Sequence, residues 1–315
     1  MARYRAKLPQ LADSVFLMDG GIETSLIFLD GIELPYFAAF DLLKSAEGRS
    51  ALQKYYSPYA QLAKDRGLGF VLESPTWRAS AEWGEKLGYG KDALARINRE
   101  AIALMAEIRA QFETPRSPMV ISGCVGPRGD GYDPGKVMSV EKAQHYHAQQ
   151  IDVFSKTEAD MVTAITMTNV NEAAGVALAA KAAQMPVVIS FTVETDGRLP
   201  TGQTLKEAII AVDAASDAAP EYFMINCAHP THFSNVVGGE EAWTKRIRGL
   251  RANASKRSHA ELDNATDLDA GDPKELAALY KEMCKRLPSL TVLGGCCGTD
   301  HRHIEQIAIA TAAKA

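Results

Sequence analysis

The sequence predicts an α/β fold, a single (β/α)8 TIM barrel domain that spans residues 1–315, and three observations support this prediction. Short apolar segments rich in β-branched residues alternate with longer amphipathic segments along the whole chain. Eight such pairs fit into about 300 residues, as expected for parallel strands that are buried on both faces. The Gly-x-Gly-x-x-Gly sequence that typically follows the first strand of an open, doubly wound sheet is absent.

The expected strands are short and are bounded by glycine, proline or polar residues. The seventh, RIRGLRANA, is poorly apolar and is the weakest of the set. The eight segments are residues 15–19, 69–73, 119–125, 160–166, 186–192, 222–227, 246–254 and 290–297.

The segments between these strands have the spacing of amphipathic helices. In the clearest case, apolar residues recur three or four positions apart from Leu94 to Ile108. Asp272 and Pro273 form a typical helix start, an N-cap followed by proline in the first turn. The expected helices cover residues 49–66, 91–112, 139–157, 169–184, 204–215, 231–245, 272–286 and 300–314.

Composition excludes several classes of protein. The chain has 34 Lys and Arg against 39 Asp and Glu, a net charge of -5, and no run of five like charges. We therefore expect no nucleic-acid partner. The most apolar stretch, 173–193, is interrupted by Lys181, Gln184 and Pro186, so we expect no membrane association. The N-terminus lacks an apolar block of signal-peptide length, and we expect a cytoplasmic protein.

Cysteine usage indicates thiols that are kept for chemistry. Five cysteines are too few for a disulfide scaffold in a chain of this length, and their number is odd. Cys284 lies in an expected helix, where a buried cysteine packs as a small apolar residue. Cys124 lies near the end of the third expected strand and either packs in the same way or lines a pocket.

The strongest local signal is GGCCGT at residues 294–299, directly after the eighth expected strand. Cys296 and Cys297 follow this strand, and Cys227 ends the sixth, so all three lie at the barrel face that carries catalytic groups. Three thiolates bind Zn²⁺ and leave one tetrahedral position open, so we predict Zn²⁺ on Cys227, Cys296 and Cys297. The alternatives are packing, a disulfide, or a closed site completed by His229, His301 or His303.

A carboxylate follows the first expected strand. Asp19, in DGG at 19–21, points into the mouth of a (β/α)8 barrel and is the candidate catalytic residue. Its alternative role is to cap a turn. The glycine-rich segment 123–131 lacks the Lys-Ser/Thr pair of a P-loop, and a tight turn explains it more economically.

Taken together, these motifs resemble the zinc-dependent homocysteine S-methyltransferase family, which includes betaine- and S-methylmethionine-using enzymes. The order INC and then GGCCGT is the most specific part of the resemblance. The matching segments are DGG at 19–21, residues 123–131, SFT at 190–192, INC at 225–227 and GGCCGT at 294–299.

The resemblance implies a (β/α)8 barrel whose Cys227, Cys296 and Cys297 bind zinc, with Asp19 and Asn226 at the substrate site. The expected reaction moves a methyl group from a sulfonium or quaternary ammonium donor to a zinc-bound thiol. The favoured acceptor is homocysteine, which would give methionine. A free thiol with a pKa near 8.5 is only a few per cent thiolate at pH 7, and zinc removes its proton. The expected substrate-binding residues are Gly20, Thr76, Trp77, Arg78, Thr166 and Asn226.

The chain departs from the family pattern at three positions. Ile165 stands where the family usually has a glutamate that meets the amino group of homocysteine. Arg78 and Arg128 stand where uncharged or aromatic residues are common, while Trp77 keeps an aromatic face for a methylated cation. We therefore also consider a more anionic acceptor, a thiol acid without an α-amino group. Glu194 or Asp196 is an alternative source of the missing carboxylate.

Other functions on the same barrel stay open. A zinc hydrolase or lyase would need a general base, and Asp19 is the residue placed to serve. A zinc- or thiol-binding protein without turnover is a further alternative. The expected partners are a small-molecule thiol and a methyl donor, drawn from S-methylmethionine, betaine-like, thetin-like and S-adenosylmethionine compounds. Oligomeric state is left open by the sequence.

Overall fold

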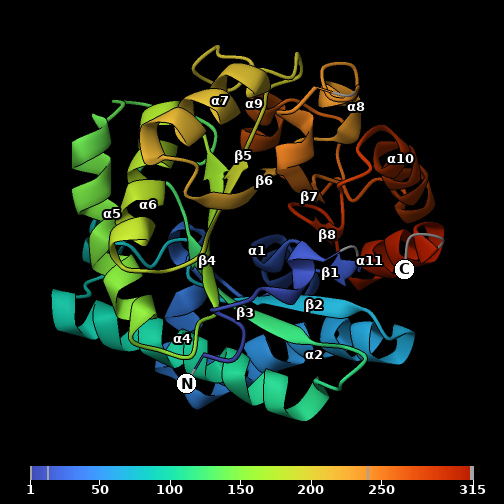
Figure 1. Cartoon of the computed structure of the whole chain (residues 1–315). Helices are drawn as coiled ribbons and strands as arrows, with labels where there is room; N and C mark the ends of the chain where they lie inside the picture. The colour runs from blue at the N-terminus through green and yellow to red at the C-terminus, as the bar shows by residue number, and fades with distance from the viewer. Residues whose placement is uncertain (1, 13, 240, 313–315) are drawn as a thin grey trace.

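The computed structural model describes residues 2–12, 14–239 and 241–312, and its strands close into one parallel barrel in sequence order (Figure 1). The barrel closes where β8 pairs with β1. All eight expected strands are present, including the poorly apolar seventh. They are β1 (Phe16–Leu17), β2 (Gly69–Glu73), β3 (Met119–Val125), β4 (Met161–Met167), β5 (Val187–Phe191), β6 (Pro220–Asn226), β7 (Ile247–Ala252) and β8 (Val292–Gly295).

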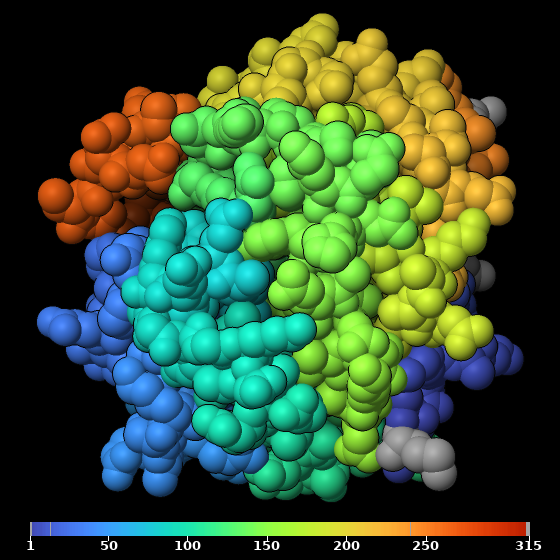
Figure 2. All heavy atoms as spheres, turned by 90° about the vertical axis from the view of Figure 1, so that its left-hand side faces the viewer, coloured from blue at the N-terminus to red at the C-terminus, as the bar shows by residue number. Residues whose placement is uncertain are grey.

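Helices surround the barrel, and the (β/α)8 prediction is confirmed (Figure 1). Figure 2 shows this outer layer from the side on which α5 lies. No helix in the described part of the chain is long and apolar enough to cross a membrane. The longer helices are α2 (Ala46–Arg66), α4 (Lys91–Phe112), α5 (Val140–Ser155), α6 (Val170–Ala182), α7 (Leu205–Ser216), α10 (Pro273–Arg286) and α11 (His301–Ala310). The shorter ones are α1 (Ile22–Thr24), α3 (Ala81–Lys86), α8 (Pro230–Phe233) and α9 (His259–Asp263).

The helix expected at 231–245 is wrong. Among the described residues of this region, which exclude 240, only α8 and a 3-10 turn at Thr244–Arg246 are helical. Gly238 and Gly239 have φ values of 132° and 88°, which a continuous right-handed helix does not allow. The last helix, expected at 300–314, ends at Ala310, and residues 313–315 lie outside the described part.

The barrel interior changes character along its axis. Its lower part is an apolar cluster that includes Phe16, Val71, Val120, Tyr222 and Val292. Alternate residues of a strand share one face, so the residues two or four positions further along each strand also point into the barrel. Towards the carboxyl ends of the strands, these inward-facing residues are polar. The polar residues are Glu73, Ser122, Thr163, Ser190, Asn226 and Arg251, and all are buried. This change accounts for the Arg251 of the poorly apolar seventh segment, which lies in the polar layer, while Arg246 and Arg248 of the same segment bond Asp213 and the carbonyl of Ala12.

Candidate active site

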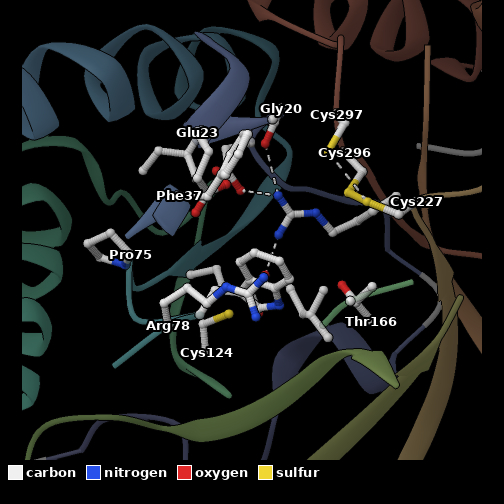
Figure 3. A pocket seen from close by; sticks show the side chains of 18 of the residues that line it. Gly20, Glu23, Phe37, Pro75, Arg78, Cys124, Thr166, Cys227, Cys296 and Cys297 are labelled. Atoms are coloured by element: carbon white, nitrogen blue, oxygen red, sulfur yellow. Dashed lines mark hydrogen bonds and ion pairs between the residues drawn. A yellow bond between two sulfur atoms is a disulfide. The ribbon is translucent and has the colours of Figure 1, made fainter. Parts of the chain in front are cut away.

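A cavity of about 170 Å³ lies at the carboxyl ends of the strands (Figure 3). Its walls come from β2, β3, β4 and β7 themselves and from the segments that follow β1, β2, β3, β6, β7 and β8. The structure brings most of the predicted site residues to this cavity, namely Asp19, Gly20, Trp77, Arg78, Thr166, Cys227, Cys296 and Cys297. Among the described residues that line the cavity, the predicted Thr76 and Asn226 are absent.

The three predicted cysteine ligands form one cluster. Their sulfur atoms all lie within 4.8 Å of one another, with Sγ of Cys227 3.7 Å from Sγ of Cys297. The turn that presents Cys296 and Cys297 requires glycine, because a Cβ at Gly295 would lie 2.0 Å from Oγ1 of Thr299. The backbone of Cys227 is also in the left-handed region, with φ of 52°. These constraints direct all three sulfurs to one point beside the cavity.

The sulfur geometry fits a tetrahedral metal. Zinc–sulfur bonds of about 2.3 Å at tetrahedral angles place sulfur atoms roughly 3.8 Å apart, close to the separation of Cys227 and Cys297. In this structure, however, Cys227 and Cys296 are joined by a disulfide, and Cys297 is a free thiol. The favoured expectation of three free thiols is thus not what the structure shows. Sulfurs held close enough to share a metal are also close enough to bond, so a three-thiolate site requires reduction of this disulfide.

The histidines near the cysteines in sequence do not join the cluster. Within the described residues, the metal-ligand group consists of the three cysteines alone. His229 accepts from the backbone of Thr231, and Nε2 of His303 bonds the carbonyl of Ala270. A different histidine, His259, supports the site from behind, with Nε2 2.8 Å from the carbonyl oxygen of Cys227.

Burial also acts on the free thiol. It raises the pKa of Cys297 to about 11, so the thiol keeps its proton at neutral pH when no cation is beside it. The Tyr132 hydroxyl lies 3.7 Å from this sulfur, and its ring stacks on His259 with centroids 4.0 Å apart. Tyr132 and His259 thus enclose the cysteine cluster.

Arg251 organises the floor of the cavity. Its Nη2 donates to Oδ1 of Asp19 at 2.9 Å and to the carbonyl of Gly20 at 3.0 Å. Its Nη1 pairs with Oε2 of Glu73, and its Nε donates to the carbonyl of Gly295. One guanidinium therefore neutralises two buried carboxylates and ties the segment after β1 to β8.

The two carboxylates are held in a low-polarity setting. Burial raises the pKa of Glu73 to about 7, and it also raises the pKa of Asp19, while Arg251 opposes both shifts. The Tyr55 hydroxyl donates to the other oxygen of Asp19 at 3.0 Å. Because both oxygens of Asp19 are engaged, this residue positions the site and is poorly placed as the general base of a hydrolase or lyase.

Asn226 and Thr76 lie beneath the cavity wall. Oδ1 of Asn226 accepts from the backbone N–H of Thr166 at 2.9 Å and from the Ser190 hydroxyl at 2.6 Å. Its amide donates to Oγ1 of Thr166 and holds that residue at a φ of 62°. The Thr76 hydroxyl donates to the carbonyl of Cys124 at 2.7 Å. Both predicted residues thus shape the backbone behind the cavity.

Arg78 reaches the cavity, and it does so between two tryptophans. Its guanidinium carbon lies 3.9 Å from the ring centre of Trp77 and 3.8 Å from that of Trp83. It donates to the carbonyl of Gly129 at 2.8 Å and lies 3.6 Å from Asp130. The aromatic face expected to hold a methylated cation is therefore already covered, on one side, by Arg78 itself.

Arg128 lies elsewhere. It pairs with Glu82 at 3.8 Å and donates to the carbonyl of Lys136, and it is not among the described residues that line the cavity. Only one of the two unusual arginines therefore adds charge to the cavity. The proposed replacements for the missing carboxylate also lie elsewhere, since Glu194 bonds His259 and Asp196 accepts from the backbone of Arg198.

Sequence reasoning missed four groups of the site. Glu23, Glu73, Arg251 and Tyr132 all line the cavity. A usable signal was present for Glu73 and Arg251, because each is a charged residue in a segment otherwise expected to be a buried strand. Glu23 lies in the short helix α1 and Tyr132 in a connecting segment, where charged and aromatic residues are common and carry little information.

Comparison with known proteins agrees with this architecture. A family model described as Homocysteine S-methyltransferase matches residues 16–311. The chain is 21% identical over 314 residues to homocysteine S-methyltransferase 1 of Brassica oleracea var. italica, covering 92% of this chain and 91% of that protein. It is 20% identical to homocysteine S-methyltransferase 2 of Arabidopsis thaliana, covering 75% of this chain and 77% of that protein.

Solved structures of the homocysteine methyltransferase MmuM from Escherichia coli have the same fold. The oxidised form matches with a TM-score of 0.74 and 16% identity, covering 99% of this chain and all of that one. The metallated form matches with a TM-score of 0.73 and 17% identity, covering 97% of this chain and 99% of that one. Since the family model also matches nearly the whole chain, this protein is a methyltransferase that belongs to the homocysteine S-methyltransferase family.

Proposed function

We propose that this protein is a zinc-dependent S-methyltransferase that transfers a methyl group from a sulfonium or quaternary ammonium donor to a thiol, with homocysteine as acceptor and methionine as product. The observation that carries the proposal is the cluster of three cysteine sulfurs within 4.8 Å of one another beside a small cavity. The curated relatives carry the name homocysteine S-methyltransferase, and one MmuM structure is described as metallated. Zinc would be the cofactor. The binding partners would be two small molecules, the thiol acceptor and the methyl donor, and the reaction would take place in the cytoplasm.

Cys227, Cys296 and Cys297 would hold the zinc once the disulfide is reduced. Zinc bound there would lower the pKa of the acceptor thiol so that it reacts as a thiolate. With three cysteine ligands, the zinc would keep one ligand position for the acceptor thiol.

The protein's own groups then position the two substrates. The methyl carbon leaves the donor with its bonding electron pair remaining on the donor sulfur or nitrogen, and it forms a new bond to the acceptor sulfur. Such an in-line transfer needs alignment more than acid–base catalysis. Accordingly, Asp19 accepts hydrogen bonds from Arg251 and Tyr55 and holds the cavity floor in place beneath the acceptor.

Arg78 is the candidate partner for the substrate carboxylate. Its side chain is 5% exposed, lines the cavity, and has an Nε that no described residue accepts from. Burial lowers its pKa to about 10, so it stays charged at neutral pH. A carboxylate is shared by homocysteine and by a thiol acid without the amino group, so Arg78 supports both acceptors.

The proposal is tested with reduced protein that has been loaded with zinc. L-homocysteine is supplied with S-methylmethionine, a betaine, a thetin or S-adenosylmethionine in turn, and methionine is measured by mass spectrometry. We expect methionine with at least one sulfonium or ammonium donor. Protein shown to hold zinc that yields no methylated product from either homocysteine or its des-amino analogue would contradict the proposal.

The redox state needs its own check in this experiment. The chain has five cysteines, of which the structure joins Cys227 and Cys296 in a disulfide, while Cys124, Cys284 and Cys297 keep their thiols. Thiol titration in denaturant should therefore count three thiols in oxidised protein and five after reduction. Only the reduced form should bind zinc, because the disulfide removes two of the three ligands.

A further inference from the structure

Glu23 is the group of the cavity that the proposed function has not used. It follows the glycine pair after β1, lies in α1, and lines the same cavity as the cysteines (Figure 3). In Figure 3 Cys227, Cys296 and Cys297 lie on one side of the cavity, and Glu23 and Arg78 lie on the other. A ligand attached to the cysteine side through its sulfur would therefore extend toward these two charged groups.

The other buried charges of the cavity already have partners. Asp19 and Glu73 share Arg251, and Arg78 lies 3.6 Å from Asp130. Glu23 differs, because within residues 2–12, 14–239 and 241–312 no side chain forms a hydrogen bond or ion pair with its carboxylate. Its local support is its own backbone N–H. A carboxylate removed from water without a cation is costly, so this position needs a positive partner.

No other cavity residue is equally suited to pair with a cation. Ile165 occupies the cavity wall at the end of β4 and has no charge. Asp130 is 51% exposed at its side chain and accepts from the backbone N–H of Tyr132. Asp263 is exposed at the rim. Glu23 is thus the partly buried carboxylate of the cavity that is free to receive a ligand.

We propose that Glu23 binds the α-ammonium group of the acceptor, so that the cavity selects an amino thiol over a thiol acid without the amino group. This inference rests on the proposed function, since it requires that the acceptor sulfur be held at the cysteines. Arg78 and Glu23 would then bind both charges of an amino acid. The guanidinium of Arg78 would bind the substrate carboxylate, and the carboxylate of Glu23 would bind the substrate ammonium.

The electrostatic state of Glu23 agrees with this role. Burial raises its pKa to about 7, and the nearby Asp19 raises it further, whereas Arg251 and Arg78 lower it. A bound ammonium would supply the missing positive charge and restore the ionised carboxylate. The acceptor suits Glu23 better than the donor, because an α-ammonium has three N–H donors while a methylated sulfonium or quaternary ammonium centre has none.

The test compares two acceptors on the reduced, zinc-loaded protein. The dissociation constants of L-homocysteine and its des-amino analogue 4-mercaptobutanoate are measured by calorimetry for the parent and for Glu23→Gln. We expect homocysteine to bind about 10- to 100-fold more weakly to the variant, as for loss of a hydrogen bond between charged groups. Binding of 4-mercaptobutanoate should change less than about threefold, because it has no ammonium to lose.

Two further variants serve as controls. Glu33→Gln makes the same chemical change at an exposed position outside the cavity and should alter neither constant. Adding Ile165→Glu to Glu23→Gln returns a carboxylate to the same cavity from β4, and it should restore part of the preference for homocysteine. Urea unfolding of each variant verifies that the fold is intact.

Three outcomes overturn the inference. Equal weakening of both acceptors would show that Glu23 supports structure, and unchanged homocysteine binding with a raised donor KM would assign Glu23 to the donor. In both cases the parent still binds thiols, so the proposed function survives. If the parent protein, shown to hold zinc, binds neither thiol, the proposed function fails and this inference fails with it.

Discussion

The two sides of the cavity differ in how they are encoded. The cysteine side consists of Cys227, Cys296 and Cys297, which follow β6 and β8 and lie in two short motifs of the sequence. The charged side consists of Glu23, which follows β1, and Arg78, which follows β2. The binding of a metal needs several ligands at fixed angles, and this leaves a recognisable sequence. The binding of a substrate charge needs one residue, which different strands can supply.

The largest effect is expected from a substitution on the cysteine side, which should remove the metal. Cys297→Ser should abolish stable zinc binding and lower kcat/KM by roughly 1000-fold or more, since metal catalysis supplies several kcal/mol. Zinc content by mass spectrometry and the initial rate of methionine formation measure both effects. Cys284→Ala, in α10 and outside the cavity, should keep its zinc. Full zinc occupancy in the Cys297 variant would remove this residue from the metal site.

The floor that joins the two sides depends on Arg251. Arg251→Met leaves Asp19 and Glu73 buried without their cation, and we expect it to lower the free energy of unfolding by about 3–5 kcal/mol. Arg248→Met, on the same strand and partly exposed, should cost less than about 1 kcal/mol. Urea denaturation compares the two variants. Equal losses would mean that the ion-pair network adds nothing specific.

On the charged side, Arg78→Met tests whether Arg78 binds the carboxylate that both acceptors share. If Arg78 holds the substrate carboxylate, kcat/KM should fall about 10- to 100-fold for L-homocysteine and for 4-mercaptobutanoate alike. This equal loss contrasts with the selective loss expected for Glu23→Gln. Steady-state kinetics with both acceptors separate the two roles. A change confined to one acceptor would contradict the assignment of Arg78.

Glu23 should also be visible in the stability of the free protein. Its pKa is raised from 4.5 to about 7, so the stability contribution present at low pH is lost as the pH rises through about 7. Glu23→Gln should therefore be more stable than the parent at pH 8, by about 1–3 kcal/mol, with the difference shrinking toward pH 5. Thermal or urea unfolding at both pH values measures it. A variant that is less stable at pH 8 would show that Glu23 is already paired.

The smallest effect is expected outside the cavity. Arg128→Gln removes a surface pair with Glu82 and an exposed hydrogen bond to the carbonyl of Lys136, so the free energy of unfolding should change by less than about 0.5 kcal/mol. Rates with both acceptors should stay within about twofold of the parent, which corresponds to about 0.4 kcal/mol. A selective loss of 4-mercaptobutanoate activity would instead return Arg128 to the substrate site.

The sequence predicted the barrel well because its signal repeats. Eight apolar segments bounded by turn residues mark the strands, and even the segment with Arg251 was found by its place in the series. The error at 231–245 arose where Gly238 and Gly239 break an otherwise helical pattern. The network of Arg251 with Asp19 and Glu73 was not predicted, because it joins residues that are far apart in sequence and leaves no local motif. The disulfide between Cys227 and Cys296 depends on redox state, which the sequence does not encode.

The binding of the acceptor thiol to a cysteine-held zinc is tested most directly by a calorimetric titration. Reduced, zinc-loaded protein is titrated with L-homocysteine at pH 8, in two buffers of different ionisation enthalpy. At this pH most of the free thiol is protonated, since its pKa is near 8.5, whereas Glu23 is mainly ionised. We predict binding at one site with release of close to one proton, lost from the thiol as its sulfur binds the metal. Binding without proton release, or no binding by protein that holds zinc, would contradict the proposal that homocysteine binds as a zinc-bound thiolate.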